Sequence, residues 1–131
     1  MNAILLCRTR HVPTPEQVAE ALCKAGYQAF VEVRNGPPTS LSAEVRYAPG
    51  RMPIVVDIYN DLYDDPDEKD YDYFNWMEEL VPNPEAREDI RRFIFVSAME
   101  NVEAKALKTV TDYLRDQTNS TVIMQDQLDK Q

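Results

Sequence analysis

Three consecutive segments of this chain alternate apolar and polar residues, and this alternation restricts the possible folds more than any other feature of the sequence. The segments span residues 29–34, 41–47 and 54–58, and residues 35–38 and 49–50, rich in Asn, Gly and Pro, separate them. Alternation with a period of two places the apolar side chains on one face of a β-strand. Short connections made of turn-forming residues join antiparallel strands. The sequence therefore predicts an antiparallel meander with one buried face.

A helix is predicted to begin at Thr14, before the first of these strands. Thr14 suits the N-cap, Pro15 suits the first helical position, and Gln17 completes a capping box. Glu16 adds a negative charge at the positive end of the helix dipole. Gly26 follows the last apolar position of the helix and is predicted to end it.

A second long helix is predicted over residues 101–117, where Leu107, Val110 and Leu114 share one face. Between the meander and this helix, residues 74–80 predict one or two helical turns. Asn83 and Pro84 predict the start of a further helix that extends to Arg92. Short apolar runs predict buried strands at residues 3–7, 93–96 and 121–124.

These elements follow one another in the order β-α-β-β-β-(α)-α-β-α-β, which predicts the α+β class. One mixed, mostly antiparallel sheet with helices packed on one face is the simplest arrangement that buries all their apolar faces. A chain of 131 residues has about the length of one domain. We therefore expect a single α+β domain over residues 1–124, followed by a polar C-terminal tail at residues 125–131.

The net charge of the chain lies entirely in residues 57–79. This stretch holds ten of the 23 acidic residues and one of the 14 basic residues, which gives it a net charge of −9. The remaining residues carry equal numbers of acids and bases. Such a localised negative field bears on binding partners rather than on the fold. It favours a basic protein partner and argues against direct binding to nucleic acid or to an anionic membrane.

No catalytic or cofactor motif stands out. The chain has three glycines, which are too few for a glycine-rich phosphate-binding loop. His11 is its only histidine, so the chain cannot form a zinc site that uses a pair of histidines. The acidic stretch also fails as an EF-hand, because an EF-hand loop that starts at Asp65 would place Lys69 at the fifth position, where an oxygen ligand is needed. We therefore expect a protein that is not an enzyme and that uses no cofactor and no metal.

Cys7 and Cys23 fall in a predicted strand and a predicted helix, and both are expected to be reduced residues of the core. The N-terminus has its positive charges after a short apolar run, the reverse of a secretory signal. No apolar stretch reaches the roughly 18 residues that span a bilayer. These features predict a cytoplasmic protein.

The acidic stretch combines carboxylates with aromatic side chains. In residues 68–73 acids alternate with other residues, so an extended backbone would place three carboxylates on one side at intervals of about 6.6 to 6.8 Å. Such a row resembles the phosphates of a nucleic-acid strand, and Tyr and Trp are enriched at binding hot spots. The predicted partner-binding residues are Asp61, Asp64, Asp65, Asp67, Glu68, Asp70, Tyr71, Asp72, Tyr73 and Trp76.

Two functional hypotheses follow from this composition. The first is a small cytoplasmic immunity or inhibitor protein that neutralises a basic enzyme, for example a toxin nuclease, with its acidic aromatic segment. The second is a regulatory or ligand-sensing α+β module, in which the acidic segment is a lid or a solvated loop. We favour the first, because the acids are concentrated in one stretch of an otherwise neutral chain.

Overall fold

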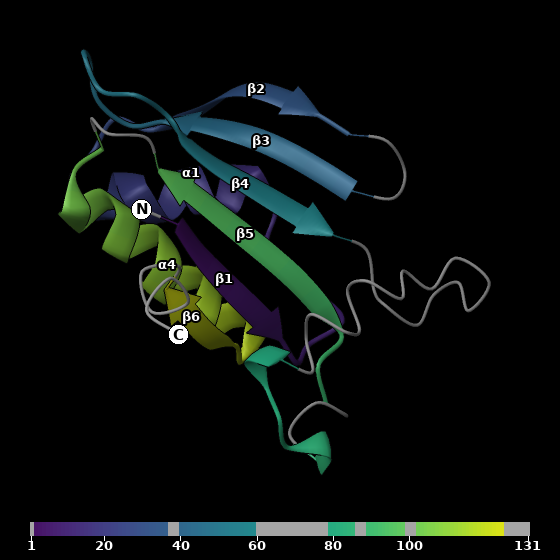
Figure 1. The fold of residues 1–131 in the computed structure, drawn as a ribbon. Helices are drawn as coiled ribbons and strands as arrows, with labels where there is room; N and C mark the ends of the chain where they lie inside the picture. The colour runs from purple at the N-terminus through teal and green to yellow at the C-terminus, as the bar shows by residue number, and fades with distance from the viewer. Residues whose placement is uncertain (1, 37–39, 60–78, 86–88, 99–101, 125–131) are drawn as a thin grey trace.

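The computed structural model describes residues 2–36, 40–59, 79–85, 89–98 and 102–124. Within these ranges the chain forms six strands, which build one sheet, and two long helices (Figure 1). Their bounds, in chain order, are β1 (Asn2–Cys7), α1 (Pro15–Lys24), β2 (Phe30–Asn35), β3 (Ser40–Arg46), β4 (Ile54–Tyr59), β5 (Arg92–Ala98), α4 (Ala104–Thr118) and β6 (Thr121–Met124).

The six strands form one sheet in the order β2-β3-β4-β5-β1-β6, and each described pair of neighbours is antiparallel. The predicted α+β class is confirmed, and the order of elements agrees approximately with the prediction. β2, β3 and β4 form the predicted meander. β1 lies between β5 and β6, which run in the same direction and are joined through α4, so the last β-α-β unit is split by the first strand.

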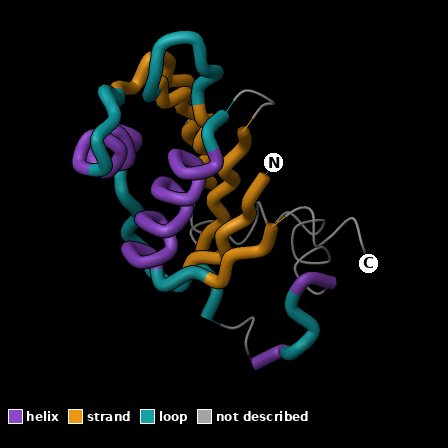
Figure 2. Tube along the Cα trace, turned by 90° about the vertical axis from the view of Figure 1, so that its left-hand side faces the viewer, coloured by secondary structure: helices purple, strands orange, loops and turns teal. Residues whose placement is uncertain are grey.

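Both long helices lie on one face of the sheet, as predicted (Figure 2). The α1 helix begins with the expected capping box: Gln17 N donates to Thr14 Oγ1 over 3.2 Å, and Thr14 N donates to Gln17 Oε1 over 2.9 Å. Gly26 follows the helix with a φ of +102°, a conformation that glycine adopts without strain. The α4 helix buries one apolar stripe that includes Leu107, Val110 and Leu114.

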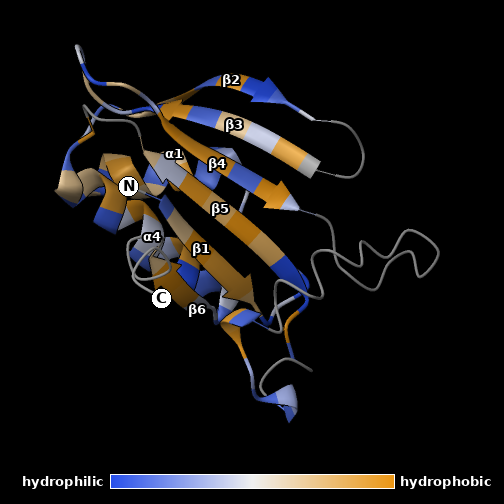
Figure 3. Cartoon of the chain, viewed as in Figure 1, coloured by the Kyte–Doolittle hydropathy of each residue, from blue (hydrophilic) through white to orange (hydrophobic). Residues whose placement is uncertain are grey.

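Two hydrophobic clusters, one on each face, hold the sheet. Figure 3 shows hydrophobic residues along the central strands β4, β5 and β1. The larger cluster lies between the sheet and the helices and includes Leu5, Leu22, Val56 and Leu114. We define the smaller one as the outer cluster; it lies on the opposite face and comprises the buried residues Ile4, Leu6, Ile90 and Phe93. The outer cluster reflects the continuous apolar runs of β1 and β5, which bury both faces of these strands.

The structure corrects two local predictions. The helix predicted to run from Asn83 to Arg92 is wrong at its end, because Arg92 begins β5 and pairs with Cys7. Its start is correct, since Glu85 N donates to Asn83 Oδ1 over 3.0 Å. Cys23 is exposed rather than part of the core, because it lies on the solvent side of α1, while Cys7 is buried as expected. Both thiols are free.

Candidate functional site

Each predicted partner-binding residue lies between residues 60 and 78, outside the described residues. This applies to Asp61, Asp64, Asp65, Asp67, Glu68, Asp70, Tyr71, Asp72, Tyr73 and Trp76. The predicted helical turns at residues 74–80 fall mostly in the same range, and the polar tail at residues 125–131 is also outside it. The geometry of the site is therefore built from the described residues on either side, which we call the two flanks of the acidic segment.

The first flank is the end of β4, where Tyr59 reaches the outer cluster. Tyr59 packs against this cluster, and its ring meets that of Phe95 edge to face with 5.3 Å between centroids. Ile58 faces the helices on the same strand and is buried. Because neighbouring residues of a strand point to opposite faces, the Tyr59 side chain lies on the face of the sheet away from the helices.

The second flank, residues 79–85, returns to the same place. Val81 is half-buried and packs against the outer cluster, as Tyr59 does. Ile90 belongs to the buried part of the cluster and precedes β5 directly. Both flanks are thus held by one group of apolar side chains on the face of the sheet away from the helices.

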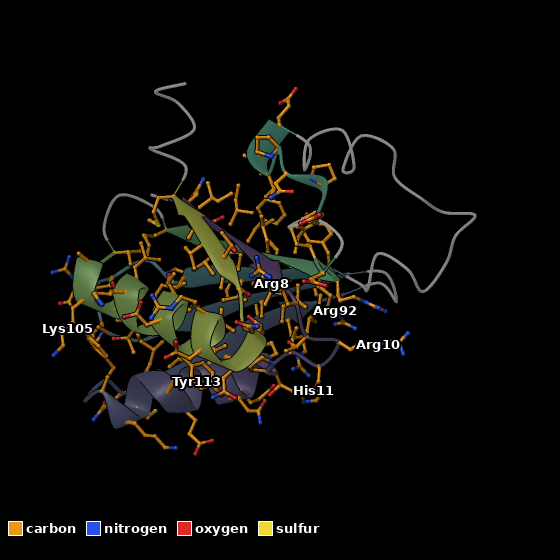
Figure 4. All side chains as sticks on the ribbon, turned by 90° about the horizontal axis from the view of Figure 1, so that it is seen from below. Arg8, Arg10, His11, Arg92, Lys105 and Tyr113 are labelled. Carbon is orange, nitrogen blue, oxygen red and sulfur yellow. The ribbon has the colours of Figure 1, made fainter. Side chains whose placement is uncertain are left out.

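A group of basic side chains, which the sequence analysis did not identify, lies at the end of β1. We define the arginine corner as Arg8, Arg10, Arg91 and Arg92. The two pairs come together because Cys7 pairs with Arg92 across β1 and β5, and Arg91 N donates to Cys7 O over 2.7 Å. Figure 4 shows Arg8, Arg10, Arg92 and His11 on the same side of the molecule. The sequence contains one signal for this group: two arginines directly follow the predicted strand at residues 3–7, and two directly precede the predicted strand at residues 93–96.

Arg8 is held by the C-terminal end of α4. Its backbone N donates to Thr118 O over 3.1 Å, and its guanidinium donates to Asn119 O over 3.0 Å and to Thr121 Oγ1 over 2.8 Å. These carbonyls carry the negative end of the helix dipole, which favours a cation there. Arg92 differs, because its Nε is buried and has no hydrogen-bond partner. A buried donor without an acceptor is uncommon and costs free energy.

Cys7 lies at the base of the arginine corner, and its surroundings oppose a nucleophilic role. Burial raises the pKa of the Cys7 thiol, although hydrogen bonds with Ser120 and Thr118 and the charges of Arg92 and Arg8 act in the opposite direction. A thiolate is the nucleophilic form of cysteine, and a raised pKa keeps the thiol protonated at neutral pH. The Cys7 thiol donates weakly to Leu5 O, 3.8 Å away. Cys7 is therefore suited to packing rather than to catalysis.

A polar network joins the turn after β3 to the start of α4. Glu103 occupies the N-cap position of α4 without a capping hydrogen bond from its side chain. Its backbone N donates to Tyr47 Oη over 2.7 Å, and its carboxylate accepts from Tyr27 Oη over 2.9 Å. The rings of Tyr27 and Tyr47 meet edge to face, and Arg51 lies 3.6 Å from the Glu103 carboxylate. Desolvation and the neighbouring Glu103 carboxylate raise the pKa of Tyr27. This network stabilises the fold.

Replacing Tyr27 with Phe is expected to lower the free energy of unfolding by about 1 kcal/mol near neutral pH. The pKa of Tyr27 is raised in the folded protein, so the contribution of Tyr27 to the free energy of unfolding is fully present below the ordinary tyrosine pKa of about 10. This contribution is lost as the pH rises through the higher pKa of the folded protein. Urea unfolding of both proteins from about pH 8 to about pH 11 measures this. A wild-type advantage that stays constant across this range would contradict the assignment.

A groove with a volume of about 350 Å³ lies between α4 and the edge strand β6. Leu107, Val122 and Met124 contribute apolar surface to it. On its rim, Asp112 lies 2.6 Å from Lys108 Nζ and 3.4 Å from Arg115 Nη1, so the rim charges are paired with one another. The groove is on the helix side of the sheet, whereas the flanks of the acidic segment are on the opposite side.

The structure adds two further observations about the described ranges. Their His, Cys, Asp and Glu side chains form no group of three or more that could hold a metal ion. Among the described helices, none is long and apolar enough to cross a membrane.

Comparison with known proteins complements this description. Searches against protein-family models, curated proteins and solved structures find no match to this chain.

Proposed function

We propose that this protein is a small acidic cytoplasmic immunity or inhibitor protein that neutralises a basic partner enzyme, for example a toxin nuclease. The observation that carries the proposal is the segregation of charge: residues 57–79 hold the whole net charge of −9, and the rest of the chain is neutral. General solubility does not require all excess charge to be in one stretch. A concentrated negative field instead attracts and orients a positively charged partner.

The flanks of the acidic segment support this proposal. Tyr59 and Val81 pack against one outer cluster, so both ends of the segment are held by the folded domain. Fixing the ends of a segment reduces the number of conformations that it loses when it binds. A segment held in this way is better suited to binding than a free acidic tail of the same composition.

The composition of the segment suggests how inhibition would occur. A row of carboxylates takes the place of substrate phosphates in the basic groove of the partner, and the tyrosines and Trp76 fill apolar pockets beside it. Neither nucleic acid nor a membrane is a direct partner in this proposal, since both are anionic. The two free thiols, Cys7 and Cys23, support a location in the reducing cytoplasm.

The groove between α4 and β6 favours a second candidate function, that of a ligand-sensing module. Its volume of about 350 Å³ falls within the usual range for small-molecule pockets. However, Tyr59 and Val81 hold the flanks of the acidic segment on the other face of the sheet. This position disfavours the acidic segment as a lid over this groove, and we therefore place the inhibitor function first.

The proposed function is tested by affinity capture followed by an activity assay. Wild-type protein, and a variant in which a Gly/Ser linker of equal length replaces residues 60–78, are immobilised and exposed to host lysate. We expect the wild type alone to retain a basic protein, and we expect added wild type to inhibit the enzymatic activity of that protein at a one-to-one ratio. Equal capture by the linker variant, or capture without inhibition, would contradict the proposal. Circular dichroism verifies that the linker variant is folded.

A further inference from the structure

We propose that the groove between α4 and β6 binds an extended apolar peptide segment of another protein, which pairs with β6 as a further strand of the sheet. β6 is the last strand in the order β2-β3-β4-β5-β1-β6, and among the described residues β1 is its only partner (Figure 1). Alternate residues of an edge strand direct their backbone N–H and C=O groups away from the sheet, where an added strand hydrogen-bonds with them. The proposal does not rest on the proposed inhibitor function, since its contacts come from described residues of α4 and β6.

The groove opens at this edge of the sheet. Within the described part of the chain its lining comes from α4 and β6, and no residue of α1 or β1 takes part. The helix contributes one face from Ala104 to Arg115, which extends over about 16 Å. The strand contributes Val122 and Met124, and its four residues extend over about 14 Å. The groove thus follows β6 along its length and matches an extended segment of about four residues.

The apolar lining determines which side chains of the peptide enter the groove. Val122 and Met124 are half-buried and pack on the helix side of the sheet, against the larger cluster that includes Leu107. Residues that lie opposite each other on paired strands point to the same face. Peptide residues opposite Val122 and Met124 therefore point into the groove, which has a volume of about 350 Å³. The peptide accordingly carries apolar side chains at two alternate positions.

The charges of the protein restrict the rest of the peptide. On the rim, Asp112 lies 2.6 Å from Lys108 Nζ and 3.4 Å from Arg115 Nη1, so these charges are paired with one another. The chain as a whole has a net charge of −9, which attracts a basic segment and repels an acidic one. The chemistry that fits the site is therefore an apolar segment flanked by basic residues.

The two edges of the sheet differ in their protection against strand addition. β2, at the opposite edge, carries the charged residues Glu32 and Arg34, and its pairing shifts register between Val31 and Val33. Charged side chains and bulges are common means of preventing an edge strand from pairing. β6 has the sequence TVIM, which contains no charge and no proline, and its pairing with β1 has no register shift. The edge beside the groove is thus the one suited to strand addition.

A second copy of this chain fits the site less well than a peptide does. A stable protein–protein interface buries roughly 1,200 Å² or more, and two strands of four residues make only a short contact. Each copy would also bring a net charge of −9, and a net charge far from zero favours the monomer. A peptide needs only the strand and the groove beside it.

The probe for this site is the acetylated and amidated peptide KTVTVTK, which has valines at alternate positions and lysines at its ends. NMR follows the backbone amide resonances of residues 121–124 while the peptide is added to the full chain. We expect saturable shifts with a Kd on the order of 100 μM. Two control peptides carry N-methyl groups on the backbone, one at the valines and one at the threonines. One of them should lose binding and the other keep it, because alternate residues of a strand pair with opposite neighbours.

A matched pair of protein variants locates the binding site. Val122→Lys should weaken peptide binding at least about tenfold, because it places a charge in the apolar groove. Val31→Lys is the control and should weaken binding less than about twofold. Val31 is also a half-buried valine of an edge strand and packs against the same larger cluster, but it lies on β2. Circular dichroism verifies that both variants are folded, and if Val122→Lys is not, the methylated peptides test the proposal on the wild type.

Three results would overturn the proposal: no saturable shift at residues 121–124, binding of both methylated peptides as tightly as the unmodified one, or equal weakening by Val122→Lys and Val31→Lys. Sedimentation of the chain without peptide tests the second copy as the occupant. A mass that doubles with concentration in the wild type but not in Val122→Lys would identify a second copy on β6 and would also overturn the proposal.

Discussion

Replacing Asp67, Glu68, Asp70 and Asp72 with their amides is expected to slow association with a basic partner by about 10- to 10³-fold at low ionic strength. Electrostatic steering raises on-rates by this range, and salt screens it over roughly 10 Å at 0.1 M. The wild type should therefore lose on-rate as salt is added, whereas the amide variant should change little. Stopped-flow measurement against the captured partner at several salt concentrations tests this difference.

A matched control removes the same charge from the folded surface. Exposed acids that form surface ion pairs are available for this purpose: Glu16, Glu20, Glu32 and Asp116. Their replacement by amides should leave most of the on-rate intact, because the charges lie outside the acidic segment. Replacing Tyr71 or Tyr73 with Ala should instead raise the off-rate, because the loss of an anchor residue weakens the binding free energy by about 2 kcal/mol. Equal salt dependence in the wild type and the segment variant would show that the acidic segment does not steer binding.

Replacing Phe93 with Ala is expected to lower the free energy of unfolding by about 3 to 5 kcal/mol. Phe93 is 1% exposed and is the largest buried residue of the outer cluster, so truncation leaves a cavity that the β-strands around it cannot close. Such a loss is a large part of the total stability of an ordinary domain. Urea unfolding followed by circular dichroism measures the change.

Phe30 provides the control for this prediction, because it is the same residue type on the same sheet but is 52% exposed. Phe30→Ala should cost about 1 kcal/mol or less, since a half-exposed side chain loses little burial. A similar loss for both variants would mean that the outer cluster contributes no more than surface contacts. In that case it would also be too weak to hold the flanks of the acidic segment.

Local sequence signals predicted most elements of the fold. The capping box at Thr14 and the glycine at Gly26 bound α1 because helix ends depend on residues within a few positions of each other. The alternation in β3 and β4 predicted which side chains are buried. The helix prediction failed at Arg92, where pairing of β5 with β1 decides the conformation of a residue whose own helical preference is good.

The candidate sites were predictable to different degrees. The acidic segment was evident from charge alone, because net charge is a sum over the sequence and needs no coordinates. Its attachment was not evident, since Tyr59 and Val81 are separated by the whole segment, and only the tertiary structure shows that both pack against the outer cluster. The arginine corner was also missed, because Arg8 and Arg92 are far apart in the chain and no local rule relates them.

The sequence by itself thus determined most of the secondary structure, the α+β class and the location of the net charge. The tertiary structure alone decided the strand order β2-β3-β4-β5-β1-β6, in which β1 lies between β5 and β6. Helix caps, turns and alternation arise from contacts between near neighbours in the chain, and so they can be read locally. Strand order depends on pairings between segments that are distant in the chain. The local signals are compatible with many orders of the same strands, and the packing of the two apolar clusters selects one of them.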